Sequence, residues 1–365
     1  MTDELFTPAV LGQLTLKNRF IRSATWDGLG NPDGSFSPAQ QKLYQALAAG
    51  GIGLITTGFI AVNPQGRRSR DQNLLCDRRQ TDTLAEIARV VHDQGSLLTA
   101  QLVHCGGAAK GSVSGRERIA PSPIDHPIYD EGVPREITTA EIEKTIADFA
   151  AAAFRAREAG CDGVQVHAAH GYLASQFLSP FSNRRKDDYG GDLTGRARFL
   201  VEICQKIRSA VGPDFTVSIK INGSDYLKEG GLSPAESLAT TQMLSGIGLD
   251  AVEVSGGNPA SRPLTPVPEK IRAGENELPF AAEQKLFASR LDLPVIAVGG
   301  IRSRAAAEKL RRSGVSFISL CRPLIRNPNL IADWQAGQSE ASDCVSCNRC
   351  FIPAYKGLGI SCLKG

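Results

Sequence analysis

Short apolar runs rich in β-branched residues recur along the chain and alternate with amphipathic segments. The runs lie at 19–24, 51–58, 97–102, 163–168, 215–221, 250–256, 293–300 and 316–322. Continuous apolar runs are typical of parallel strands covered on both faces, and intervening segments such as EIEKTIADFAAAAFRAREAG have helical periodicity. Eight strand-and-helix units predict an α/β fold, a (β/α)8 TIM barrel.

The same alternation is compatible with an open, doubly wound sheet. That fold usually carries a glycine-rich nucleotide motif, but GxGxxG is missing from the first strand-to-helix turns and GxxxxGK[ST] does not occur. The closed barrel is therefore favoured. Two long connections, 103–138 and 178–195, both follow strands, so we expect them at the C-terminal face of the barrel, where loops usually build a site.

The pattern changes after Trp334, where QAGQSEASD leads into a cluster of cysteines. We place a boundary there, with a barrel domain at 1–335 and a short Cys-rich C-terminal tail at 336–365. The tail is too short to form a hydrophobic core of its own.

Composition excludes several classes of function. Lys and Arg number 41 against 38 Asp and Glu, and these basic residues are scattered, which argues against a nucleic-acid partner. The N-terminal MTDELFTPAV lacks the features of a secretory signal, and the apolar run at 51–62 is too short to span a membrane. The dispersed cysteines fit a reducing compartment, so we expect a cytoplasmic protein without a membrane partner.

The stretch VQVHAAHGYL places His167, His170 and Tyr172 at the end of the fourth predicted strand. Two neutral imidazoles can each donate an N–H to one carbonyl oxygen, and a nearby phenol can deliver a proton to carbon. This set suits reduction of a double bond conjugated to a carbonyl. Each residue could instead be structural, and His-x-x-His without a third ligand is a weak zinc signal.

The segment VHAAHGYLASQFLSPFSNRRKDDYGGDLTGRARF closely resembles the signature of the Old Yellow Enzyme family of FMN-dependent ene reductases. The similarity extends from FTPAVLGQLTLKNRF to LCRPLIRNPNL. It implies bound FMN, NAD(P)H as electron donor, carbonyl binding by His167 and His170, and Tyr172 as proton donor. The flavin contacts that it implies are Ser23, Ala24, Thr25, Gly58, Gln101 and Lys220. Lys220 occupies a position where many relatives have arginine, and either cation near N1 and O2 stabilises reduced flavin.

Two segments at the ends of the last two predicted strands have the features of a phosphate site. They are AVGG, with Gly299 and Gly300, and LCRP, with Cys321 and Arg322. Glycines let backbone N–H groups approach an anion, and Arg322 adds a permanent charge.

Because the sequence has no Rossmann fingerprint, NAD(P)H would bind at the flavin face and leave before the second substrate enters.

The tail reads DCVSCNRCFIPAYKGLGISCLKG, with Cys344, Cys347 and Cys350 at two-residue gaps and Cys362 after eleven intervening residues. Such spacing can hold a [4Fe–4S] cluster, while zinc or free thiols stay open as alternatives. The segment resembles the iron–sulfur segment of the 2,4-dienoyl-CoA reductase and trimethylamine dehydrogenase branch, in which the cluster passes electrons to FMN.

We therefore expect an FMN-dependent oxidoreductase that uses NAD(P)H to reduce a small-molecule enone or enoyl substrate. The alternative is an electron-accepting FMN/iron–sulfur subunit that is fed by a redox partner protein. A non-catalytic flavin-binding barrel is disfavoured, because binding alone does not need the proton donor Tyr172. The resemblance also implies a homo-oligomer.

Overall fold

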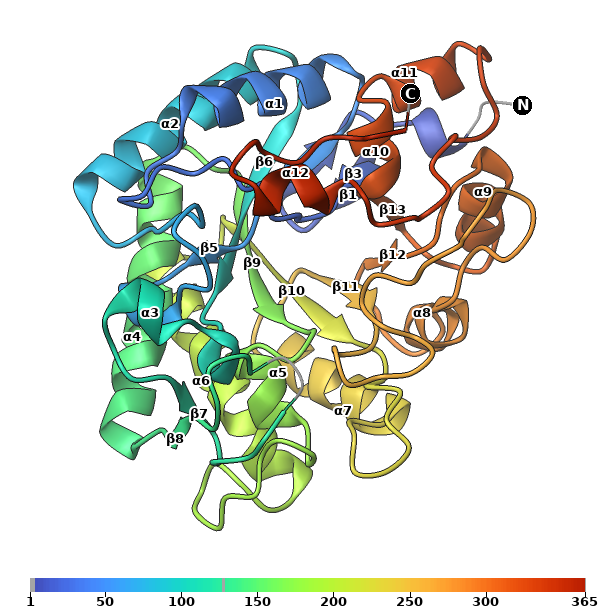
Figure 1. Cartoon of the computed structure of the whole chain (residues 1–365). Helices are drawn as coiled ribbons and strands as arrows, with labels where there is room; N and C mark the ends of the chain where they lie inside the picture. Colours follow the sequence, from blue (N-terminus) through green and yellow to red (C-terminus); the bar gives the residue numbers. More distant parts are fainter. Residues whose placement is uncertain (1–3, 127–128, 365) are drawn as a thin grey trace.

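Eight parallel strands close into a barrel in this computed structural model, which describes residues 4–126 and 129–364 (Figure 1). They are β3 (Phe20–Arg22), β4 (Leu54–Thr56), β6 (Leu97–Val103), β9 (Gly163–Ala168), β10 (Thr216–Asn222), β11 (Ala251–Ser255), β12 (Val295–Val298) and β13 (Phe317–Leu320). Pairing of β13 with β3 and of β4 with β6 completes the ring. The (β/α)8 prediction is confirmed, and the alternative of an open sheet is wrong.

Helices surround the barrel and cover its outer face (Figure 1). The longer ones are α1 (Pro38–Ala49), α2 (Arg78–His92), α4 (Thr139–Glu158), α6 (Leu193–Val211), α7 (Pro234–Ser245), α8 (Ala281–Ala288) and α9 (Arg304–Arg312). Several begin at a capping box, as when Thr138 caps α4 and the Glu141 carboxylate accepts a hydrogen bond from the Thr138 backbone N–H. Such reciprocal bonds satisfy N–H groups that the first turn leaves unpaired.

The N-terminal end of the barrel is closed by a hairpin of β1 (Ala9–Leu11) and β2 (Leu14–Leu16), which follows the 3-10 helix η1 (Glu4–Phe6). Leu11 and Leu16 are buried and pack in one cluster with Ile21, Ile296 and Phe317 of the barrel. This apolar plug excludes water from one end, so the opposite end is left to form a site.

The long connection after β6 contains η3 (Gly106–Ala108), α3 (Gly111–Ser114), β7 (Ile119–Ala120) and β8 (Arg135–Glu136). Two further small elements, β5 (Ile60–Ala61) and η2 (Pro64–Gly66), follow β4. The connection 178–195, between α5 (Leu173–Leu178) and α6, packs behind the first one. Its Arg185 donates hydrogen bonds to the carbonyls of Pro121 and Ile137 at 3.3 and 2.7 Å.

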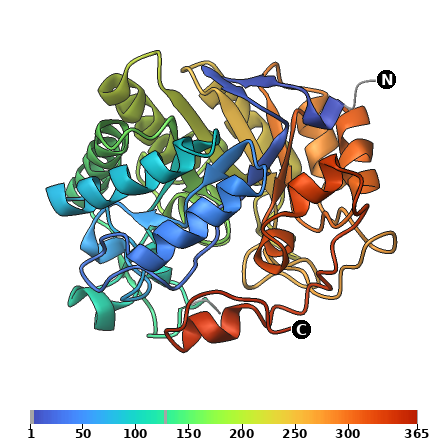
Figure 2. The same ribbon diagram turned by 90° about the horizontal axis from the view of Figure 1, so that it is seen from above.

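The chain after β13 forms α10 (Arg322–Arg326), α11 (Leu330–Gln335) and α12 (Phe351–Tyr355). Figure 2 shows α12, in red, at the end of the barrel opposite the β1–β2 hairpin. Its Tyr355 ring lies 5.1 Å, centroid to centroid, from the ring of Trp26, and the Ile360 N–H donates to the Asp27 carbonyl at 2.7 Å. The tail therefore packs on the barrel, and its division at residue 335 into a separate unit stays a prediction. Within the described ranges, no helix is both long and apolar enough to cross a membrane.

Candidate functional site

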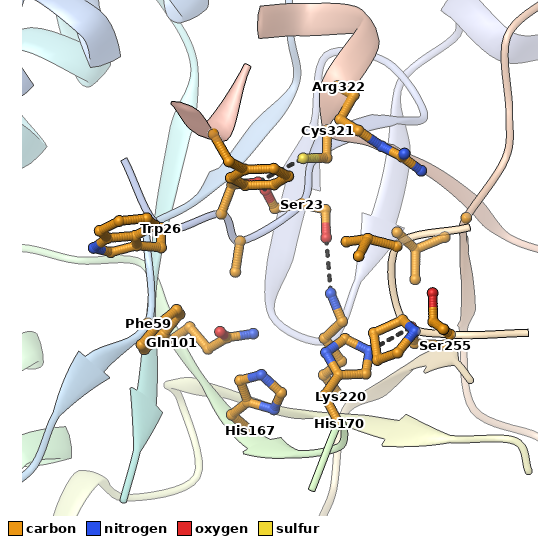
Figure 3. Close-up of a pocket in the computed structure, with 18 of the residues that line it drawn as sticks. Ser23, Trp26, Phe59, Gln101, His167, His170, Lys220, Ser255, Cys321 and Arg322 are labelled. Atoms are coloured by element: carbon orange, nitrogen blue, oxygen red, sulfur yellow. Dashed lines mark hydrogen bonds between the residues drawn. The ribbon is translucent and has the colours of Figure 1, made fainter. Parts of the chain in front are cut away.

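A cavity of about 1000 Å³ opens at the C-terminal ends of the barrel strands (Figure 3). Its walls include nearly all the barrel residues that the sequence marked: Ser23, Ala24, Thr25, Gln101, His167, His170, Tyr172, Lys220, Gly299, Gly300, Cys321 and Arg322. Gly58 does not line the cavity. It lies behind Thr25, where an added Cβ would be 2.9 Å from the Thr25 carbonyl oxygen. The connection 178–195 also contributes no lining residue, because it packs against the connection after β6.

Strand β9 and the turn after it bring the two imidazoles and the phenol together. His170 and Gly171 adopt positive φ values of 63° and 78°, so the chain reverses directly after the strand. The ring of His167 consequently lies 5.2 Å from that of His170 and 4.9 Å from that of Tyr172, measured between centroids. Three side chains that are close in sequence thus share one wall.

Both imidazoles are neutral at ordinary pH. Burial, together with the charge of Lys220, holds the pKa of His167 and of His170 well below the usual value. The Ala169 N–H donates to His167 Nδ1 at 3.3 Å, which leaves Nε2 as the protonated nitrogen. His170 Nε2 lies 2.8 Å from Ser255 Oγ, a partner that sequence reasoning missed (Figure 3).

Tyr172 keeps its proton. Burial raises the pKa of its phenol above the usual 10. The ring packs 5.5 Å from that of Phe59, which lines the same wall. A protonated phenol beside two neutral imidazole groups can act as a proton donor to a ligand held in the cavity.

A buried polar network lies beneath the cavity and depends on strand register. Lys220 of β10 pairs with His167 of β9 on one side and with Glu253 of β11 on the other. Lys220 Nζ lies 3.1 Å from Glu253 Oε1. It also donates to Ser23 Oγ at 3.0 Å (Figure 3). Glu253 is fully buried. Sequence reasoning missed this carboxylate, because nothing local distinguishes it from any other strand residue.

The network continues to Gln101. Gln101 and Gln165 are register partners on β6 and β9, and Gln101 Nε2 donates to Gln165 Oε1 at 2.7 Å. Gln165 Nε2 in turn donates to Glu253 Oε2 at 3.0 Å. The chain of hydrogen bonds satisfies buried polar groups and fixes the amide of Gln101 at the cavity wall.

Thr25 and Cys321 contact each other across the barrel closure. Thr25 Oγ1 lies 2.8 Å from Cys321 Sγ, and the same hydroxyl donates to the Ser23 carbonyl at 3.1 Å. Both side chains line the cavity. The Thr25 hydroxyl is therefore held by protein partners at this position.

Two buried arginines converge at the far end of the cavity. Arg302 is 2% exposed and Arg322 is 7% exposed, and both line the cavity. Burial and the neighbouring Arg322 lower the pKa of Arg302. Arg302 Nε is buried and has no hydrogen-bond partner among the described residues. Two adjacent cations, one of which has an unused hydrogen-bond donor, favour the binding of an anion here.

The glycines beside these arginines form a tight turn at the end of β12. Gly299 and Gly300 have φ values of 112° and 69°, and a Cβ at Gly300 would lie 2.3 Å from Cδ of Pro279. Only glycine fits there without strain. The orphaned Arg302 donor, the glycine turn and the cavity volume together fit FMN, with its phosphate at this end. The sequence had marked Arg322 but not Arg302.

The four tail cysteines line one small cavity of about 20 Å³ next to Arg322. They are not gathered into a ligand set: among the residues described, no group of three or more His, Cys, Asp or Glu side chains could hold a metal ion. Burial raises the pKa of Cys350 to about 12, which keeps it a thiol when no metal is bound. A cluster or a zinc ion at these cysteines therefore stays a prediction.

Comparison with known proteins identifies relatives over almost the whole chain. The NADH:flavin oxidoreductase / NADH oxidase family matches residues 4–340. An NADH oxidase from Thermoanaerobacter brockii is 36% identical over 94% of this chain, which spans only 52% of that protein. A 4,4'-dithiodibutanoate disulfide reductase from Rhodococcus erythropolis is 32% identical, over 98% of this chain and 94% of its own length.

A solved structure is similar over the tail as well as the barrel. The 2-naphthoyl-CoA reductase in complex with 2-naphthoyl-CoA superposes with a TM-score of 0.92 at 25% identity, over 99% of this chain and 57% of that one. The chain therefore spans about half the length of two of these three relatives.

Proposed function

This chain belongs to the NADH:flavin oxidoreductase / NADH oxidase family, the Old Yellow Enzyme type of FMN and NAD(P)H oxidoreductase, and we propose that it reduces C=C bonds conjugated to a carbonyl. One observation carries this proposal: two neutral imidazoles and a protonated phenol share one wall of the large cavity. The family implies FMN and NAD(P)H, whereas the reaction and the residue roles are our proposal.

The residues that would hold FMN are those of the two ends of the cavity. Gly299, Gly300, Arg302 and Arg322 would bind the phosphate, and Lys220, Gln101 and the Ser23–Thr25 segment would contact the ring. When bound, FMN supplies the hydride. Side chains of this protein would bind the substrate carbonyl and donate the proton.

We propose that His167 Nε2–H and a ring N–H of His170 donate to the substrate carbonyl oxygen. Ser255, by donating to Nε2 of His170, would leave the proton on Nδ1 of that ring. These donors stabilise the negative charge that develops on the oxygen when the double bond is reduced. Tyr172 then gives its phenolic proton to the α-carbon, and solvent restores it.

Replacing Tyr172 with phenylalanine tests the assignment. With FMN-loaded protein, we expect flavin reduction by NAD(P)H to be unchanged, while reoxidation by 2-cyclohexenone slows by about 100-fold, a typical general-acid contribution. Rapid-mixing absorbance measures the two half-reactions separately. Tyr189→Phe is the matched control, because Tyr189 lies in the connection that does not reach the cavity and its hydroxyl donates to Glu202 Oε2 of α6. Equal slowing of both half-reactions by Tyr172→Phe would contradict a proton-donor role.

A second candidate is the electron-accepting subunit of a larger complex, fed through the tail cysteines by a partner flavoprotein. It is favoured by the shared Arg322, which lines both the cysteine cavity and the large one. Iron and zinc analysis of anaerobically purified protein, with its visible spectrum, decides it. About four irons per chain and negligible NAD(P)H turnover without a partner would support the subunit. Flavin without iron and rapid turnover would support the self-contained reductase.

A homo-oligomer also stays a prediction.

A further inference from the structure

The charges on the cavity wall bear on the chemical class of the substrate. This inference rests on the proposed ene reduction. Away from the phosphate end, and apart from Lys220, whose charge is compensated by Glu253, three cations line the cavity, Arg68, Lys110 and Arg262, and two carboxylates do so, Asp71 and Asp130. The wall around the bound substrate therefore carries one net positive charge.

That positive charge is concentrated on the arginines. Lys110 Nζ lies 3.0 Å from Asp130 Oδ2, so this lysine is compensated. Asp71 accepts a hydrogen bond from the Trp26 indole N–H at 3.1 Å. Among the residues described, neither Arg68 nor Arg262 has a carboxylate within ion-pair distance.

Arg68 is held in place while part of its guanidinium is left unused. Its backbone N–H donates to Gln72 Oε1 at 2.7 Å, and its Nη1 donates to the Ala108 carbonyl at 2.7 Å. For Nε and Nη2 the described residues provide no hydrogen-bond partner. A half-buried guanidinium that faces a cavity with two free donor nitrogens matches the geometry of a carboxylate.

Arg68 also lies near the reacting groups. Burial raises the pKa of the Tyr172 phenol, and the charge of Arg68 opposes that rise, which places this guanidinium within electrostatic reach of the phenol. Arg262 is exposed, and its Nη1 donates to two carbonyls of its own loop, those of Pro259 and Ser261. Water and salt screen an exposed charge, so Arg68 is the stronger anchor.

We propose that Arg68 binds a carboxylate of the substrate at the end remote from the carbonyl, so that the enzyme acts on anionic enones or enoyl compounds. With the carbonyl on His167 and His170 and the carboxylate on Arg68, both ends of the substrate are fixed. The double bond between them is then held in one orientation beside Tyr172.

Acid and ester pairs test this substrate class. The probes are (E)-4-oxopent-2-enoate and (E)-6-oxohept-4-enoate, each beside its methyl ester, so that two spacings between carbonyl and carboxylate are covered. We expect wild-type kcat/KM to favour at least one acid over its ester by tenfold or more. Arg68→Gln should lower kcat/KM for that acid about tenfold, close to the low end of what a hydrogen bond to a charged group contributes, and leave the ester unchanged.

Arg70→Gln is the matched control. Arg70 lies two residues further along the same loop, is exposed and does not line the cavity, so the variant removes the same charge without touching the site. It should leave both acid and ester unchanged. Equal kcat/KM for acid and ester in the wild type, or equal losses for both in Arg68→Gln, would overturn the inference.

A binding measurement separates this inference from the proposed function. Titration of the FMN-loaded protein with 4-hydroxybenzoate and with its methyl ester, followed by flavin absorbance, needs no turnover. If wild type prefers the acid and Arg68→Gln does not, the carboxylate site is supported even where no alkene is reduced, an outcome that would reject only the ene reductase. Equal affinities for acid and ester would reject the carboxylate site.

The phosphates of NAD(P)H are the other anions that could reach Arg68. The rate of flavin reduction as a function of NADPH and NADH concentration distinguishes them. We expect Arg68→Gln to leave the half-saturating concentrations unchanged. If the half-saturating concentrations rise while the ratio of kcat/KM for acid and ester stays as in the wild type, Arg68 binds the nucleotide and the inference is overturned.

Discussion

The ion pair of Lys220 and Glu253 supports a quantitative prediction about stability. Lys220 Nζ and Glu253 Oε1 are 3.1 Å apart, and the two side chains are only 6% and 0% exposed. Lys220→Met replaces the ammonium group with an apolar chain of similar length. The variant leaves the Glu253 carboxylate buried beneath the cavity without its counter-ion.

The hydrogen bonds that Glu253 keeps in this variant set the size of the loss in unfolding free energy. Breaking a buried pair by removing one partner costs about 3–5 kcal/mol. Glu253 keeps hydrogen bonds from Ser23 Oγ at 2.7 Å and Gln165 Nε2 at 3.0 Å, so we expect the lower end, about 3 kcal/mol. Adding Glu253→Gln removes the uncompensated charge, and the double variant should recover about half of that loss.

Urea unfolding of the FMN-free chain, followed by far-ultraviolet circular dichroism, measures these free energies. Lys144→Met is the control, because its pair with Asp148 lies at the surface with side-chain exposures of 65% and 22%. It should cost less than about 1 kcal/mol. If the unfolding free energy of Lys220→Met lies within about 1 kcal/mol of the wild-type value, or the double variant is no more stable than the single one, the reasoning about burial is refuted.

Two further predictions concern the phosphate end and the response to acid. Arg302→Gln should weaken FMN binding by about tenfold or more, measured by flavin fluorescence during dialysis, whereas the exposed Arg312→Gln should not. Burial lowers the pKa of His104 to about 4. Unfolded histidine gains a proton below about pH 6.5, while folded His104 does not, so the contribution of His104 to the unfolding free energy should be constant above pH 7 and fall as pH drops from 6.5 to 4. His104→Gln should remove up to about 3 kcal/mol of that fall, and an unchanged pH profile would contradict the assignment.

The fold and the part of the site that β9 and its following turn provide could be predicted from the sequence. Each barrel strand is buried on both faces, so it appears as a continuous apolar run whatever its partners are. Five of the eight strands are shorter than the runs, as in β4, which covers Leu54–Thr56 within the run 51–58, because the flanking residues leave the hydrogen-bonded ladder at the barrel rims. His167, His170 and Tyr172 were also predictable, since one strand end and one turn hold all three.

The partners of those residues were not predictable. Glu253, Gln165 and Ser255 occupy ordinary strand positions, and Arg302 and Arg68 occupy ordinary loop positions. Each acquires its setting from residues distant in sequence, as with Gln101 and Gln165, which are 64 positions apart. The second long connection was expected to help build the site. In the structure it packs instead behind the connection after β6, because side chains such as Arg185 contact that connection.

By itself, the sequence determined the barrel, the segment with two imidazoles and a phenol, and the glycine turn that an anion can approach, because each depends on residues that are neighbours along the chain. Only the tertiary structure decided that Lys220 meets Glu253, that two arginines share the phosphate end and that the tail forms one wall of the cavity. Closing eight strands fixes a register between elements far apart in sequence, and burial then sets the charge state of the groups that this register brings together.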